Sequence, residues 1–150
     1  KWTTYRRMAQ DTINKVIALG KLPRRKCQTK HLHIHGADGS ADDADHLYIY
    51  GTDQKAIEQL IKESPGLGEK LHPRLEFLKA EVVWAVKNEM ALTVEDVLAR
   101  RVRILFLDAK ASQDVAPQVA EILAEYLDKD EAWKQSQVAE FTQLANQYII

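Results

Sequence analysis

Apolar residues recur at three- and four-residue spacings through most of this 150-residue chain, and this periodicity most strongly limits its fold. In residues 4–19, Tyr5, Met8 and Ile13 share one helical face. Gly20 follows where a glycine commonly ends a helix. The spacing predicts a first helix over residues 4–19 and favours a helical fold for the whole chain.

Similar patterns predict five further helices. Residues 75–90 also contain valines and a tryptophan typical of strands, but their length and their alanine, glutamate and lysine content favour a helix. Thr93 and Asp96 have the spacing of a capping box, in which each side chain accepts from the other's backbone N–H. The expected ranges are residues 52–62 with Thr52 as N-cap, 75–90, 94–111, a helix with Pro117 in its first turn, and a last helix capped by Asp130.

Residues 21–51 break this pattern with proline, glycine and aspartate, which predicts a long connection with an extended piece at residues 31–35. We therefore expect an all-α, irregular domain of about six helices, with one long loop at residues 21–51 that has room for a short strand.

The composition excludes several classes of partner. The chain has 21 basic and 22 acidic residues and a net charge of -1, which provides no overall attraction for nucleic acid. The single Cys27 cannot form an internal disulfide, and no apolar run approaches the roughly 20 residues that span a bilayer. These features predict a cytoplasmic setting. Because the sequence opens on Lys1, we expect it to be a piece of a longer protein.

The sequence HLHIH places His31, His33 and His35 on one side of an extended segment, where imidazoles suit zinc. Thiolate partners and the usual ligand spacings are missing, so we favour a strand whose Leu32 and Ile34 face the core. The following DGSADDAD lacks the glycine and glutamate of a calcium-binding loop and is interpreted as a solvated turn.

Two arginines on the predicted helix at residues 94–111 are expected to form ion pairs. Arg100 follows Asp96 by four residues, the favourable order for a helical pair. Arg101 lies beside an apolar stripe and requires a partner such as Glu81 or Glu89 on the preceding helix. Neither arginine is expected to be catalytic.

The opening stretch, KWTTYRRMAQD, combines hydroxyls and free N–H groups at a helix start with nearby cations. This arrangement favours an anion. From periodicity alone, arginines pointing into solvent are the simpler interpretation.

This stretch resembles the Gly-Gly-Lys-x-Thr-Thr-Tyr-Arg segment of the FAD-dependent, quinone-linked glycerol-3-phosphate dehydrogenases and the related oxidases. LHIHGADG, LYIYGTD and KAEVVWAVKNEMALTVEDVLARRVRILFLDAKAS follow in the order found in the C-terminal helical domain of those enzymes. The resemblance covers nearly the whole chain, although no G-x-G-x-x-G fingerprint is present.

The resemblance implies a parent that oxidises sn-glycerol 3-phosphate to dihydroxyacetone phosphate and passes electrons through FAD to quinone. Residues 1–150 would be its C-terminal helical cap, packed on upstream FAD and substrate domains, with Lys1, Thr3 and Thr4 near the flavin and Arg6 and Arg7 on the FAD domain. The parent would be cytoplasmic and peripherally bound to the membrane, with a homo-oligomer left open. The fragment alone, without FAD or the catalytic base, is expected to be inactive.

Two alternatives remain open. The chain could be a free-standing helical module that binds a protein or an anion through its basic N-terminal end, or a histidine-rich metal-binding domain. The sequence also does not separate a dehydrogenase from an oxidase.

Overall fold

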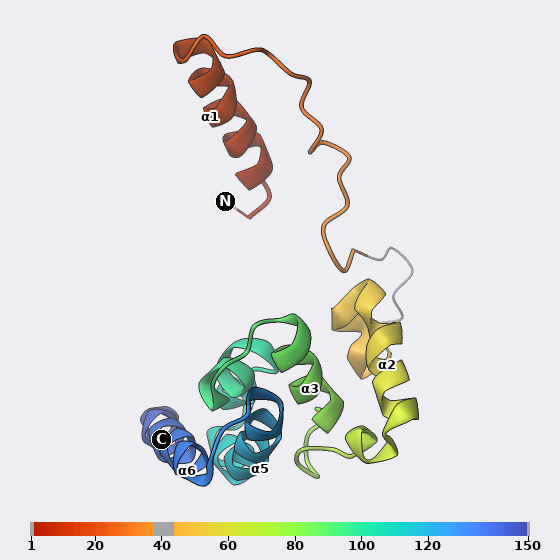
Figure 1. Ribbon diagram of the computed structural model, residues 1–150, viewed down its shortest axis with the longest axis vertical. Helices are drawn as coiled ribbons and strands as arrows, with labels where there is room; N and C mark the ends of the chain where they lie inside the picture. Colours follow the sequence, from red (N-terminus) through yellow and green to blue (C-terminus); the bar gives the residue numbers. More distant parts are fainter. Residues whose placement is uncertain (1, 38–43, 150) are drawn as a thin grey trace. The chain divides into compact units, whose positions relative to one another are not determined.

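A computed structural model describes residues 2–37 and 44–149, and these described residues divide into two compact units (Figure 1). The first unit ends at Ala37 and contains helix α1 (Tyr5–Leu19) and the connection after it. The second unit contains all the other helices. Helices are the regular structure of both units, and no strand forms in the described residues, which confirms the all-α prediction.

The core of the second unit is built by α3 (Lys79–Asn88), α5 (Ala109–Leu127) and α6 (Glu131–Ala145). Helices α5 and α6 lie side by side, and α3 packs on α5 (Figure 1). Their facing positions carry apolar side chains that are fully buried, since these helices keep one apolar stripe toward the others. The core includes Val82, Leu98, Leu105, Val119, Leu123 and Phe141.

A smaller cluster lies on the other side of α3. The 3₁₀ helix η1 (His46–Asp53) and α2 (Gln54–Glu63) pack against one another, and α2 contacts α3. Leu47, Ile57 and Ala80 form the buried centre of this cluster. A short 3₁₀ turn, η2 (Pro65–Gly68), follows the end of α2.

The predicted loop at residues 21–51 is therefore too long at its C-terminal end, because η1 begins at His46. The Asp45 carboxylate caps η1 by accepting from the N–H of Leu47 at 2.8 Å. Helix α2 follows directly, so Thr52 lies inside η1 and is not the N-cap that the sequence predicted. No strand forms at residues 31–35, so the expectation of a short strand there was wrong. Most of the predicted DGSADDAD turn lies outside the described residues.

The predicted helix at residues 94–111 is divided into three. A π-helical turn, η3 (Asp96–Arg101), is followed by α4 (Ile104–Leu107), and α5 begins at Ala109. The backbone breaks at Arg103, whose φ of 59° is left-handed, and at Asp108, which caps α5 through the N–H of Ala111. Helix α5 then continues through Pro117, so the helix start predicted there was wrong.

The ends of the other helices follow the sequence more closely. Helix α1 ends before Gly20, and Asp130 caps α6 by accepting from the N–H of Trp133 at 2.9 Å. A 3₁₀ turn, η4 (Asn146–Tyr148), closes the described chain. Helix α3 is shorter than the predicted residues 75–90, because Leu78 pairs in an extended bridge with Lys70. None of the described helices is long and apolar enough to cross a membrane.

Candidate functional site

The sequence placed its candidate site at the start of α1. Thr3 and Thr4 are exposed and directly precede the helix, Thr4 as the N-cap residue, whereas Lys1 lies outside the described residues. The Thr4 hydroxyl makes no capping bond to the helix and lies 3.9 Å from the sulfur of Met8. The first turn carries no acidic residue. The N–H groups of such a turn have no partner within the helix, so this end presents donors and positive charge.

The two arginines of this turn make contacts within the first unit. Arg7 pairs with Asp11 at 3.5 Å. Arg6 donates to Gln10 at 3.0 Å and to the hydroxyl of Thr29 at 3.5 Å, and lies 3.8 Å from the sulfur of Cys27. Hydrogen bonds from Thr29, assisted by the charge of Arg6, lower the pKa of the Cys27 thiol. Arg6 thereby joins residues 27–29 of the connection to α1.

Helix α1 has no buried residue in this chain. The apolar face of this helix carries Tyr5, Met8, Ile13 and Val16, and all four are exposed. Such a stripe on a helix is usually covered by another part of a protein.

The histidine segment is exposed as well. Leu32 and Ile34, predicted to face a core, are 70% and 67% exposed, and that interpretation was wrong. Within the described residues, no three histidine, cysteine, aspartate or glutamate side chains are placed to hold a metal ion.

The second unit contains a polar cluster that sequence reasoning missed. Glu81 on α3 is completely buried, and its carboxylate accepts from the N–H of Leu78 at 2.7 Å and from the hydroxyl of Tyr50 at 3.0 Å. The oxygen that accepts from Leu78, Oε2, also lies 2.9 Å from Nε2 of His46. Burial and the neighbouring Glu81 carboxylate raise the pKa of Tyr50, so this phenol stays protonated and donates. One carboxylate thus ties both ends of the HLYIY segment to α3.

The only signal for this cluster in the sequence was a glutamate inside the apolar run KAEVVWAV. Glu81 was considered there as a partner for Arg101, but the structure gives that role to Glu89.

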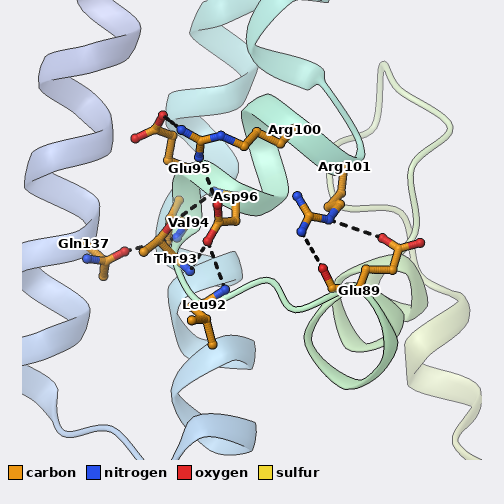
Figure 2. A network of polar contacts seen from close by, with 9 residues as sticks. All are labelled: Glu89, Leu92, Thr93, Val94, Glu95, Asp96, Arg100, Arg101 and Gln137. Carbon is orange, nitrogen blue, oxygen red and sulfur yellow. Dashed lines mark hydrogen bonds and ion pairs between the residues drawn. The ribbon is translucent and has the colours of Figure 1, made fainter. Parts of the chain in front are cut away.

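A second carboxylate, that of Glu89 directly after α3, holds the π-helical turn (Figure 2). The Nε of Arg101 lies 3.6 Å from Glu89, and its guanidinium also donates to the backbone carbonyl of Glu89. Burial raises the pKa of Glu89, although the charge of Arg101 acts in the opposite direction. The ion pair predicted between these helices is confirmed.

The same view shows how the turn begins (Figure 2). The N–H of Asp96 donates to the Thr93 hydroxyl at 3.0 Å, while the N–H of Thr93 donates to the Asp96 carboxylate at 3.1 Å. Arg100 donates to Asp96 at 2.9 Å, as its spacing predicted, and also to Glu95. Gln137 on α6 accepts from the N–H of Val94 at 3.1 Å. The predicted capping box and the Asp96–Arg100 pair are both confirmed.

An open groove lies between η1 and the segment that runs from η3 into α4, and we call it the η1–α4 groove. It is lined by His46, Tyr48, Ile49, Phe77, Arg101, Val102, Arg103, Phe106 and Leu107. The lining residues are mostly apolar, and the two arginines among them, Arg101 and Arg103, carry positive charge. The ring of Phe77 meets that of His46 edge to face at 5.0 Å between centroids. The guanidinium of Arg103 lies 5.8 Å from the centre of the Phe106 ring.

Comparison with known proteins identifies the chain's relatives. Residues 27–134 match the model of the C-terminal domain of alpha-glycerophosphate oxidase. The chain is similar to a probable mitochondrial glycerol-3-phosphate dehydrogenase of Caenorhabditis elegans, with 33% identity over 159 residues. That alignment covers 92% of this chain and 22% of the relative.

Two further relatives agree. The mitochondrial glycerol-3-phosphate dehydrogenase of Homo sapiens is 30% identical over 161 residues, which cover 92% of this chain and 22% of that protein. A mitochondrial glycerol-3-phosphate dehydrogenase of Arabidopsis thaliana is 30% identical over 180 residues, covering 99% of this chain and 28% of the relative.

The chain thus spans only about a quarter of the length of these relatives. No solved structure matches it. The family match covers most of the second unit, including α3, the η1–α4 groove and α5, and it ends in the first turn of α6. The chain belongs to the family of the C-terminal domain of glycerol-3-phosphate oxidases and dehydrogenases.

Proposed function

We propose that residues 1–150 are the C-terminal helical part of a larger flavoenzyme that oxidises sn-glycerol 3-phosphate to dihydroxyacetone phosphate. The observation that carries this proposal is the family match over residues 27–134, together with relatives named glycerol-3-phosphate dehydrogenase along 92% of the chain. In this enzyme, electrons pass through FAD to membrane quinone. The chain contributes a helical cap on the FAD and substrate domains, which precede it.

The start of α1 fits a role beside the flavin. When bound, FAD would supply an acceptor for the substrate's electrons, and its reduced ring would carry negative charge. The first turn of α1 offers backbone donors, no carboxylate, and the hydroxyls of Thr3 and Thr4. Donors of this kind stabilise negative charge. We assign Thr3 and Thr4, with Lys1 before them, to the flavin side of the parent active site.

The rest of α1 fits a contact with the preceding domain. Its stripe of Tyr5, Met8, Ile13 and Val16 is exposed in this chain, and Arg7 is exposed beside Asp11. We propose that the FAD domain covers this stripe and contacts Arg6 and Arg7. The first turn then lies where its donors reach the cofactor.

The isolated chain is proposed to be catalytically inactive and to bind no FAD, because its sequence contains no G-x-G-x-x-G fingerprint. Purified residues 1–150 are expected to show no flavin absorbance and no glycerol 3-phosphate oxidation. Either signal from the fragment would overturn this part of the proposal.

We propose that the parent is peripherally bound to a membrane, since its electron acceptor is dissolved there. The sequence predicted a cytoplasmic enzyme, whereas the curated relatives are named as mitochondrial. Cell fractionation of the full-length protein separates these two placements.

The experiment that tests the site is a Thr3→Val, Thr4→Val double variant of the full-length enzyme. Valine keeps the shape of threonine but removes the hydroxyl, so the expected result is a loss of flavin content and of turnover. The control is Thr12→Val, since the hydroxyl of Thr12 donates to the Met8 carbonyl within α1, at 2.9 Å. Unaltered flavin content and turnover in the double variant would refute the assignment of Thr3 and Thr4.

A further inference from the structure

The η1–α4 groove exposes large apolar side chains that the packing of the second unit does not bury. Phe106 is 52% exposed and Leu107 is 67% exposed, although both belong to a helix that is buried on its other side. Tyr48 and Ile49 are exposed across the groove, and Tyr148 extends the patch by an edge-to-face contact with Phe106. Contiguous apolar patches of this kind mark interaction sites on folded proteins.

Both walls of the groove are fixed to α3 by buried or half-buried carboxylates. Glu81 holds His46 and Tyr50 on η1, and Tyr48 and Ile49 lie between these two anchored residues. Glu89 holds Arg101 on the opposite wall. The surface is therefore organised before any partner arrives, which lowers the entropic cost of docking.

The charge of the groove narrows the choice of partner. Arg101 is paired with Glu89, but Arg103 forms no ion pair with any described residue, and no acidic side chain lines the groove. An isologous contact with a second copy would bring two Arg103 side chains together, which is unfavourable. The complementary surface is an apolar ridge that carries a carboxylate.

We propose that the η1–α4 groove docks the preceding FAD and substrate domains of the same chain through such a ridge. This inference rests on the proposed function, which requires those domains. Only 22% of the length of the C. elegans and human relatives aligns with this chain, so most of their length is left to supply the ridge. Arg103 pairs with its carboxylate, and Phe106 and Leu107 become buried.

The test uses the full-length enzyme with the photo-crosslinking residue p-benzoylphenylalanine in place of Phe106. The control carries the same residue in place of Leu92, which is similarly exposed but does not line the groove. Mass spectrometry of the crosslinked peptides is expected to join position 106, and not position 92, to a peptide that precedes Lys1 in the same chain. A crosslink to a second copy, to lipid or only to residues 2–37 overturns the proposal, as does the absence of any crosslink.

Arg103→Glu tests the charge, with Arg103→Lys as the matched control that keeps it. The glutamate variant is expected to lose most of the intrachain crosslink from position 106, and the lysine variant to keep it. Equal yields in both variants overturn the role of Arg103. The flavin absorbance of the unsubstituted enzyme separates the two hypotheses: a flavin-free enzyme refutes the proposed function, whereas a flavin-loaded enzyme without the crosslink refutes only the docking.

Discussion

Glu81 shows how one buried carboxylate organises a large part of the second unit. It is inaccessible to solvent and is surrounded by Leu78 N–H, the Tyr50 hydroxyl and His46. A buried charge is tolerated only where such donors satisfy it. The contacts with Tyr50 and His46 give η1 its position on α3, so the residue links packing to the shape of the groove.

We expect Glu81→Ala to lower the free energy of unfolding of the second unit by about 3 kcal/mol, because buried donors lose their acceptor. Urea denaturation followed by tryptophan fluorescence measures this, since Trp84 and Trp133 lie in α3 and α6. Glu81→Gln keeps the shape and one acceptor and should lose less.

The control for this measurement is Glu125→Ala, an exposed position of α5. It should stay within about 0.5 kcal/mol of the unsubstituted chain. If Glu81→Ala matched that control, the cluster would not be what holds η1 in place.

Among the elements, the π-helical turn η3 depends on the capping box at its start. Asp96 is partly buried, which opposes its ionisation, but the N–H groups of Leu92 and Thr93, the Thr93 hydroxyl and Arg100 outweigh burial and lower its pKa. A carboxylate with a lowered pKa contributes stability above its unfolded pKa of about 3.9, and this stability is lost as the pH falls through the folded pKa.

Asp96→Asn is therefore expected to lower the free energy of unfolding by about 1 kcal/mol at pH 7, because it removes the charge and keeps the shape. The difference from the unsubstituted chain should shrink as the pH falls below about 4, because Asp96 becomes neutral first in the unfolded chain and, at lower pH, in the folded one. Urea midpoints at pH 7 and pH 3.5 test this. A gap of equal size at both pH values would mean that the charge of Asp96 does not stabilise the turn.

The elements also show what the sequence could predict and why. The capping signals at Thr93 and Asp130 were correct because they depend on residues three apart along the chain. The break at Arg103 gave no signal, because the four residues after it, ILFL, are all apolar and leave no polar face from which a change of periodicity could be read. Asp108 was an overlooked N-cap.

Pro117 was misleading for a related reason. A proline normally favours the first turn, but Val115, Ala116, Val119 and Ala120 are buried around it, and this packing carries α5 through the exposed proline. Tertiary burial therefore overrode a local preference. The contacts of Glu81 with Tyr50 and His46 could not be predicted, since these partners lie 31 and 35 residues away in sequence.

At the scale of the whole molecule, the two units differ in what supports them. The second unit has its own core, whereas α1 has no buried residue. Isolated helices of about 12–15 residues are marginal in water. The resemblance placed the whole chain on upstream domains, and α1 is the element for which this support matters most.

Hydrogen exchange measured by mass spectrometry is expected to show fast exchange of the α1 amides in the 150-residue chain and slow exchange of those in α3 and α5. In the full-length enzyme the α1 amides should become protected, because the FAD domain then covers the apolar stripe. Strong protection of the α1 amides in the 150-residue chain alone would show that the helix is stable without the FAD domain. Unchanged exchange of α3 in both proteins serves as the internal control.

The connection after α1 also determines where a protease can divide the chain. Lys21, Arg24, Arg25, Lys26 and Lys30 are exposed in a segment without regular structure, and these are the residues after which trypsin cleaves. Proteases cut most readily where the backbone is accessible and unsupported by packing. Digestion under native conditions therefore offers a direct route to the helical unit that starts beyond this segment, separated from α1 without redesigning the gene.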